Sequence, residues 1–279
     1  MPELPEVQTI VNDLKTAGLV GATISGARVC WSRTIAEPSV DEFCSQIIGQ
    51  KIADISRRGK FIVFSFVSGL TMLIHLRMSG RLNIVDACAD CTKHEHIIFN
   101  FGTNLHLRFH DTRKFGRIHL LKDPGRILDK LGPEPLDEKF TQEILKKRLL
   151  AHKRMLKPLL LDQAFIAGLG NIYVDEALWE ARIHPCRTSC SLTDREIRSL
   201  HRAICLVLRR GLKNLGTTLG DGETNFYSVA RRKGRNRDEL RVFRRTGEPC
   251  PRCRTLIERM VVGQRSSHIC PVCQQLEGR

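Results

Sequence analysis

Two pairs of cysteines near the C-terminus constrain the fold more than any other part of the sequence. Cys250 and Cys253 form one CxxC pair, Cys270 and Cys273 form the second, and sixteen residues separate the pairs. Four thiolates at this spacing are typical of a structural zinc site. We therefore expect one structural Zn2+ ion on these four cysteines, with no coordination position left for a catalytic water. Two disulfides or a redox pair are the alternatives.

Composition limits the classes of partner and of compartment. The chain has 279 residues, 42% of them hydrophobic, which is enough for two or three packed units. Lysine and arginine number 45 against 30 acidic residues, giving a net charge of +15, which favours a polyanionic partner such as nucleic acid or an anionic membrane surface. An odd number of cysteines, 11, and an N-terminus without signal-peptide features predict free thiols in a reducing cytoplasm. Insertion into a membrane is not expected, because the most apolar stretch, residues 61–76, is interrupted by polar residues, and no membrane partner is expected.

Hydrophobic periodicity divides the chain into a strand-rich and a helix-rich part. An N-terminal helix is predicted from Val7, Ile10, Val11 and Leu14, which recur at helical spacing before Gly18. Residues 51–121 alternate with period two and predict antiparallel strands of a sandwich. Prolines in residues 131–136 end that pattern and indicate a domain boundary.

The remaining chain is predicted to be helical up to a basic loop. Thr193 and Glu196 are spaced as a capping box at the start of one helix. Residues 168–171 read GLGN before another helical pattern, so backbone N–H groups can meet a phosphate there, although a plain tight turn is the alternative. We expect an α+β protein with four parts: an N-terminal β-sandwich domain (1–131), a helical domain (132–219), a mobile basic loop (220–247) and a zinc finger (248–279).

The first residues carry a candidate nucleophile. Removal of Met1 would leave the secondary amine of Pro2 beside the carboxylate of Glu3. A free α-amino group has a pKa near ~8, so a useful fraction is unprotonated at neutral pH. Such an amine forms a cationic iminium with an aldehyde-level carbon, and that cation accepts electrons. A frayed, inert terminus is the alternative from composition and position alone.

A second group of metal-ligand types precedes one of the predicted strands. Cys88, Cys91, His94 and His96 have plausible ligand spacing, but they lead directly into the strand at 97–101. Polar residues at the edge of a strand need no metal, so we do not expect a metal site there.

Six motifs in one order resemble the bacterial formamidopyrimidine-DNA glycosylase (8-oxoguanine DNA glycosylase/AP lyase) family. They are PELPE (2–6), RRGKF (57–61), HLRMSG (75–80), DTRKFG (111–116), GLGNIY (168–173) and the four-cysteine pattern. The resemblance implies a β-sandwich-like N-terminal domain with a flanking helix, a helix-two-turn-helix domain and a four-cysteine zinc finger. It also implies a monomer that acts on double-stranded DNA containing oxidised bases or abasic sites.

The resemblance implies roles for individual residues. Pro2 would attack the sugar C1′ and expel the damaged base, with Glu3 as general acid or base. Lys60 would serve the first elimination and Arg265, in the finger, the second. The void left by the extruded base would be filled by Met78, Arg113 and Phe115. Phosphates would be contacted by Asn171, His94 and Lys153. From the residues alone, Met78 and Phe115 also fit a core, and Lys60 also fits a solvated basic face.

Four features depart from the family pattern. Arg77 stands where glycine is usual, Thr112 where proline is usual, and His152 where lysine is usual. Residues 220–247 are more basic than expected for the loop that closes over the extruded base. An endonuclease VIII-like enzyme for oxidised pyrimidines is the nearest alternative, and Leu4 argues against it. A non-catalytic binder of damaged DNA is the other alternative, and it would have no reason to retain Pro2, Glu3 and Lys60 together.

Overall fold

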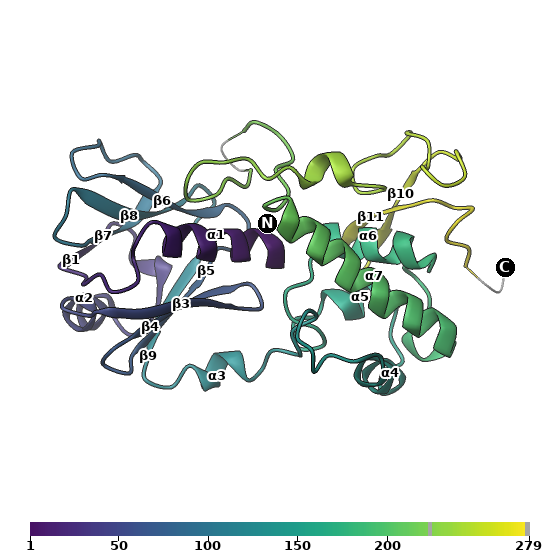
Figure 1. Cartoon of the computed structure of the whole chain (residues 1–279), viewed down its shortest axis with the longest axis horizontal. Coiled ribbons are helices and arrows are strands. Elements are labelled where there is room, and N and C mark those ends of the chain that lie inside the picture. The colour runs from purple at the N-terminus through teal and green to yellow at the C-terminus, as the bar shows by residue number, and fades with distance from the viewer. Residues whose placement is uncertain (223–224, 277–279) are drawn as a thin grey trace. The chain divides into compact units, whose positions relative to one another are not determined.

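The computed structural model describes residues 1–222 and 225–276, which form two compact units (Figure 1). The first unit comprises Met1–Asp129 and Leu212–Arg237, and the second comprises Lys130–Gly211 and Asp238–Arg279. Two positions of the predicted basic loop, 223 and 224, and the last three of the predicted finger, 277–279, lie outside the described residues. In the part of the chain that is described, no helix is long and apolar enough to cross a membrane.

The first unit contains two β-sheets. A four-stranded antiparallel sheet has the order β1 (Gly26–Val29), β7 (Glu95–Asn100), β8 (Leu105–Asp111) and β6 (Gly80–Asp86). A five-stranded sheet has the order β2 (Ile35–Glu37), β9 (Arg117–Leu121), β5 (Thr71–His75), β4 (Phe61–Phe66) and β3 (Ile52–Arg58). Only the β2–β9 pair is parallel among these strands. The predicted sandwich of period-two strands is therefore confirmed.

One apolar core fills the space between these sheets. Phe64 and Ile74 come from the five-stranded sheet, Phe99 and Phe109 come from the four-stranded sheet, and all four are fully buried. Helix α1 (Leu4–Thr16) contributes its predicted apolar face to the same core. Helix α2 (Val40–Ile47) packs Phe43 there, whereas the short η1 (Ser32–Thr34) and α3 (Gly125–Leu128) are peripheral connections.

The second unit is helical and ends in a β-hairpin. Its helices are α4 (Gln142–Leu150), α5 (Leu156–Leu161), α6 (Asn171–Ala181) and α7 (Asp194–Lys213), with short 3-10 turns at η2 (Ser189–Ser191) and η3 (Asn236–Glu239). The predicted capping box of α7 is confirmed, because the Glu196 N–H donates to the Thr193 hydroxyl at 3.3 Å and the Thr193 N–H donates to the Glu196 carboxylate at 2.7 Å. The hairpin of β10 (Glu258–Val262) and β11 (Arg265–Ile269) carries the C-terminal cysteines on its flanks.

Candidate active site

Pro2 and Glu3 are held at the start of α1 by a reciprocal set of hydrogen bonds. The Glu3 N–H donates to a Glu6 carboxylate oxygen at 2.8 Å, and the Glu3 side chain accepts from the backbone N–H of Glu6. Pro5 suits the first turn, where its missing N–H is not needed. Pro2 is buried and Glu3 is only 2% exposed. The N-terminus is therefore a fixed part of the first unit.

Glu6 also fixes a segment more than two hundred residues away. Its second carboxylate oxygen accepts the Thr217 N–H at 2.7 Å. The neighbouring Gly216 has a φ of 83°, and a Cβ there would lie 2.9 Å from the Glu6 Cγ. Asp13, further along α1, accepts the Ala230 N–H at 3.1 Å and the Arg232 guanidinium. Two carboxylates of α1 thus hold Thr217, just before the basic loop, and Ala230 and Arg232 within it, all in the first unit.

Glu6→Gln is expected to lower the free energy of unfolding by about 1–3 kcal/mol, because an amide nitrogen cannot accept and one buried N–H loses its partner. Urea denaturation of the full chain measures this. Glu42→Gln is the matched control, since Glu42 occupies the same capping-box position on α2 but is exposed. We expect that control to change stability by less than about 1 kcal/mol. Equal effects of the two substitutions would contradict the role of the Thr217 contact.

A small cavity opens beside Pro2. One part of its wall comes from the N-terminus, α1 and the residues around the start of β6, and the other part comes from the basic loop. The residues of the first part are Met1, Pro2, Ile10, Met78, Ser79, Gly80 and Arg81, and those of the loop are Asn225, Phe226 and Tyr227. Residues far apart in the sequence therefore meet around the candidate nucleophile, all within the first unit.

Asp111 joins the two loops that carry the expected void-filling residues. Its fully buried carboxylate accepts the Ser79 hydroxyl, the Arg113 N–H at 3.1 Å and the Gly116 N–H at 2.7 Å. Gly116 admits no side chain, because a Cβ would lie 2.3 Å from the Phe109 ring. A single buried carboxylate thus positions the loop after β5 relative to the loop after β8.

The side chains on these loops are exposed although they are large and apolar. Met78 is 37% exposed and Phe115 is 47% exposed. The Arg113 guanidinium lies 5.1 Å from the centroid of the Phe115 ring, which fixes one against the other. Core positions, the alternative for Met78 and Phe115, are thereby excluded. Exposed apolar side chains on well-anchored loops are what insertion into a base stack requires.

Arg77, which stands where the family usually has glycine, adopts a backbone conformation that favours glycine. Arg77 has a φ of 54°, in the left-handed region that favours glycine. Its N–H donates to His75 Nδ1 at 3.0 Å, which helps to hold that conformation. Burial, together with the positive charges of Arg77 and Lys60, lowers the pKa of His75 to about 3, so its ring is neutral. Thr112, the second departure, lies half-buried in the turn after β8, and nothing in the structure explains the change from proline.

Lys60 lies in the tight turn between β3 and β4 and is only 5% exposed. The preceding Gly59 has a φ of 55°, which the turn requires. The alternative of a solvated basic face is therefore excluded for Lys60. Its charge lies close enough to His75 to depress the pKa of that ring.

In the second unit, Asn171 begins α6 and is hydrogen-bonded to the start of β11 in the finger hairpin. Its side-chain amide donates to the Ser266 carbonyl at 3.0 Å, and the Lys157 ammonium donates to the same carbonyl at 2.7 Å. Lys157 also pairs with Asp175 at 2.6 Å, and the other Asp175 oxygen accepts the His268 N–H at 3.0 Å. These buried groups fix the start of β11, where exposed Arg265 lies.

The four cysteine sulfurs fit one zinc ion. They lie within 4.8 Å of one another, with separations of 3.9 Å for Cys250–Cys273, 3.3 Å for Cys253–Cys270 and 3.5 Å for Cys253–Cys273. A regular tetrahedron of sulfurs about 2.3 Å from zinc has edges of about 3.8 Å. Hydrogen bonds, foremost from the Thr255 side chain, lower the pKa of Cys253 to about 6, whereas burial raises the pKa of Cys270 and of Cys273 above the ordinary value, so the fit to zinc rests on the sulfur geometry. All four ligands come from protein, so the site is structural.

The remaining expected contact residues have different surroundings. Lys153 is exposed, whereas His152, the third departure, is occupied: its Nδ1 lies 2.8 Å from the Arg148 carbonyl and its ring packs on Phe165. His94 is half-buried, with its ring 5.6 Å from that of His110. His96 Nε2 lies 2.7 Å from the Asp111 carbonyl.

The sequence analysis missed the carboxylates that position these groups. Asp13, Asp111 and Asp175 are all buried and each holds two segments together. Glu176 is buried as well and accepts the N–H groups of residues 241–243 at 2.9 Å each; burial raises its pKa while these donors oppose the rise. A sequence signal for Asp175 and Glu176 was present, because these two consecutive acids interrupt the otherwise apolar stretch 172–179.

Comparison with known proteins places the chain among DNA repair enzymes. Sequence profiles match the formamidopyrimidine-DNA glycosylase N-terminal domain at residues 1–118, the H2TH domain of the same enzyme at 131–221, and a zinc finger found in FPG and IleRS at 247–276. A formamidopyrimidine-DNA glycosylase of Protochlamydia amoebophila is 48% identical, covering 99% of this chain and 100% of the relative. One from Pelotomaculum thermopropionicum is 44% identical with the same coverage.

Solved structures give the same result. A mutant Lactococcus lactis FPG in complex with DNA containing Fapy-dG superposes with a TM-score of 0.91 at 35% identity, covering 99% of this chain and 100% of that one. MutM in complex with DNA containing carbocyclic 8-oxo-G gives a TM-score of 0.90 at 34% identity with the same coverage. The fold and site define a class of protein that combines a β-sandwich domain, a helix-two-turn-helix domain and a four-cysteine zinc finger. The chain belongs to the formamidopyrimidine-DNA glycosylase family.

Proposed function

We propose that the protein is a bifunctional DNA glycosylase and AP lyase that excises 8-oxoguanine and formamidopyrimidines from double-stranded DNA in base excision repair. The observation that carries the proposal is the placement of Pro2 and Glu3: both are buried and fixed, beside a cavity that the Met78 loop and residues 225–227 line. Relatives of this family that have been solved with DNA contain the corresponding lesions in their complexes.

The chemistry begins at the amine of Pro2, freed by removal of Met1. Its lone pair forms a bond to the sugar C1′, and the damaged base departs with the electrons of the glycosidic bond. Glu3 supplies and removes protons at the sugar as this bond breaks. Loss of a proton from Pro2 nitrogen and opening of the sugar ring give the cationic iminium. That cation acidifies C2′, so loss of its proton expels the 3′ phosphate, and a second elimination expels the 5′ phosphate.

We assign the remaining roles from position and chemistry. Lys60, buried beside neutral His75, serves the first elimination, and Arg265 at the hairpin turn serves the second. Asn171, His94 and Lys153 contact phosphates. Met78, Arg113 and Phe115 occupy the place of the extruded base, because extrusion costs a few kcal/mol that wedge side chains offset. The zinc ion holds the finger that carries Arg265.

The proposed division of the chain follows these roles. We propose a catalytic domain at 1–131, a helix-two-turn-helix domain at 132–219, a base-recognition loop at 220–247 and the finger at 248–279. Contacts of Ala230 and Arg232 with Asp13 on α1 support a role of that loop beside Pro2. We further propose that the protein acts as a monomer on chromosomal DNA in the bacterial cytoplasm.

Borohydride trapping tests the proposed function. Incubation with a duplex carrying one 8-oxoguanine opposite cytosine is expected to give a covalent protein–DNA adduct, since borohydride reduces the iminium to a stable amine. Pro2→Gly and undamaged duplex are the controls, and mass spectrometry of the mature protein is expected to show that Met1 is absent. Intact Met1 would leave the nucleophile in an amide and would refute the mechanism. Trapping only on a duplex with an oxidised pyrimidine would instead favour an endonuclease VIII-like specificity.

Affinity for undamaged duplex is expected to fall steeply with salt, because the +15 net charge makes phosphate contacts the main source of non-specific binding. The slope of log affinity against log salt should be about −0.9 for each phosphate contact. Fluorescence anisotropy at several salt concentrations measures this. Lys153→Met should reduce the slope by about one contact, and an unchanged slope would remove Lys153 from the DNA footprint.

A further inference from the structure

One face of α7 carries a stripe of arginines that the proposed function does not use. Arg195, Arg198, Arg202 and Arg209 follow one another at spacings of three, four and seven residues, so they share one side of the helix. The buried residues of α7 lie on its other side: Ile197, Leu200, Ala203, Ile204, Val207, Leu208 and Gly211. The stripe extends for about 21 Å along the helix, at about 1.5 Å per residue.

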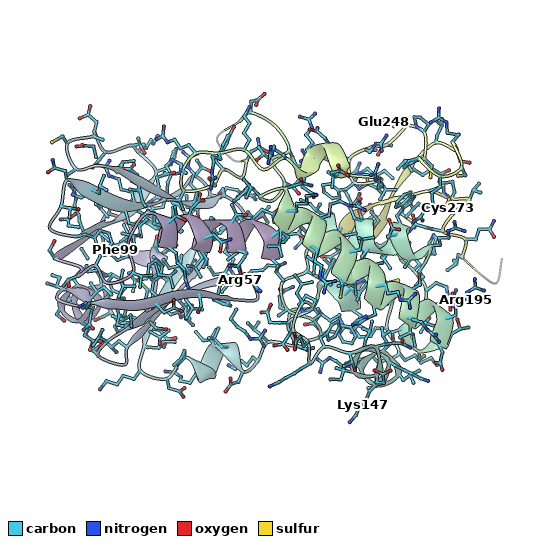
Figure 2. All side chains as sticks on the ribbon, viewed as in Figure 1. Arg57, Phe99, Lys147, Arg195, Glu248 and Cys273 are labelled. Carbon is cyan, nitrogen blue, oxygen red and sulfur yellow. The ribbon has the colours of Figure 1, made fainter. Side chains whose placement is uncertain are left out.

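These four guanidinium groups are exposed and, among the residues that the structure describes, they have no ion pair or hydrogen bond. The one carboxylate in the same hollow, Glu180, is already bound to Arg252 at 2.9 Å. The start of the helix adds positive potential beside Arg195 through the aligned peptide dipoles. The face is thus a concentration of positive charge without internal compensation. Figure 2 shows Arg195 on this helix and Lys147 on the neighbouring α4.

The wide gap in the stripe between Arg202 and Arg209 is apolar. Leu206 is 45% exposed and lies between Arg202 and Arg209 on the same side of the helix, next to half-buried Cys205. Cys205 is held in place by its contact with the Pro135 carbonyl at 3.4 Å. Together the arginines and these residues line a hollow of about 680 Å³. Its chemistry is an apolar floor with a cationic border.

This hollow is distant from Asn171, one of the residues proposed to contact phosphates. Within the second unit, Asn171 begins α6, whereas Glu180 at the hollow lies nine residues later. That separation is about 14 Å along the helix axis. Occupation of the hollow therefore leaves the start of α6 accessible.

We propose that this face binds an acidic amphipathic segment of a partner protein. Carboxylates at helical spacing would pair with the arginines, and an apolar side chain between them would cover Leu206. A phosphate backbone pairs with the arginines equally well, but it has no apolar group that would cover the exposed side chain of Leu206. Charge complementarity and the apolar floor together favour the peptide.

The test measures binding of a fluorescein-labelled helical peptide of about twelve residues, with glutamates at i, i+3 and i+7 and leucine on the same face. The probe is titrated with the zinc-loaded full chain, and fluorescence anisotropy is recorded. Saturable binding is expected, and a peptide with glutamine in place of glutamate should bind at least about tenfold more weakly. Absence of saturable binding up to about 1 mM protein would overturn the proposal.

Matched variants locate the site. Arg202→Glu is expected to weaken peptide binding about tenfold, whereas Lys147→Glu, with the same change of net charge on exposed α4, should change it less than about twofold. Leu206→Asn should weaken it about fivefold. Excision of 8-oxoguanine from a short duplex should remain unchanged in all three, which separates this proposal from the proposed function. Equal effects of Arg202→Glu and Lys147→Glu on the peptide would overturn it. A larger effect of Arg202→Glu on undamaged duplex than on peptide would also overturn it, in favour of a DNA surface.

Discussion

Glu3→Gln is expected to slow removal of 8-oxoguanine by about 10²–10⁴-fold, because an amide cannot transfer a proton at the sugar. The substitution preserves the fold, since glutamine retains an oxygen that can accept the backbone N–H of Glu6. Single-turnover rates of base release measure the effect. Thermal unfolding should change little, which separates lost chemistry from lost structure.

A duplex that already contains an abasic site sharpens this test. No glycosidic bond remains to be broken there, and the Pro2 amine is intact in the variant. Borohydride should therefore trap Glu3→Gln on abasic DNA much more efficiently than on 8-oxoguanine DNA. Gln8→Glu is a useful control on the same helix, because Gln8 is half-buried and bonded to Asn12 and Arg57. If the Glu3→Gln variant released the base at a rate within about fivefold of that of the unsubstituted protein, Glu3 would not have its assigned role.

Loss of zinc is expected to abolish both lesion binding and strand cleavage. The apparent binding free energy of a structural zinc site is about 10–16 kcal/mol, and this energy is what folds so small a module. Cys270→Ser should reduce bound zinc from one per chain to below one tenth and should lower affinity for lesion DNA by at least about 10²-fold. Zinc content measures the loss of metal, hydrogen exchange of residues 248–276 measures the loss of the finger's fold, and anisotropy with lesion duplex measures the loss of affinity.

Two exposed cysteines provide the matched control. Cys88→Ser and Cys91→Ser remove thiols outside the zinc site and should change neither zinc content nor cleavage. Full cleavage by a metal-free Cys270→Ser protein would contradict the structural role of zinc. Loss of activity in the Cys88 and Cys91 variants would show that the second cysteine group has a function.

Local patterns in the sequence were sufficient for much of the fold. The apolar spacing of α1, the alternation in β3 to β9 and the Thr193 capping box can each be read within a window of a few residues, which is why they could be predicted. The finger was predictable for a related reason, because ligand spacing around a metal is fixed by its tetrahedral geometry. The family motifs pointed to Pro2, Glu3 and the wedge residues.

Contacts between distant segments could not be predicted. Asp13 and Arg232 are 219 positions apart, and Glu6 and Thr217 are separated by 211. Asp111 was part of a quoted motif, but its three donors come from two loops that only the finished sandwich brings together. Arg77 showed the reverse case: a residue that breaks the glycine pattern still adopts the backbone conformation that the glycine pattern implies.

The double use of the Glu6 carboxylate links two events that are far apart in the chain. One oxygen accepts from Glu3, next to the proposed nucleophile Pro2, and the other accepts from Thr217, just before the segment that lines the Pro2 cavity. Withdrawal of that segment strips a buried carboxylate of one donor, at a cost of about 1–3 kcal/mol. The cost is borne by the same side chain that orients the N-terminus. The Glu6 carboxylate therefore links the N-terminal turn of α1 to the Thr217 backbone, so a disturbance of one contact acts on the same side chain as the other.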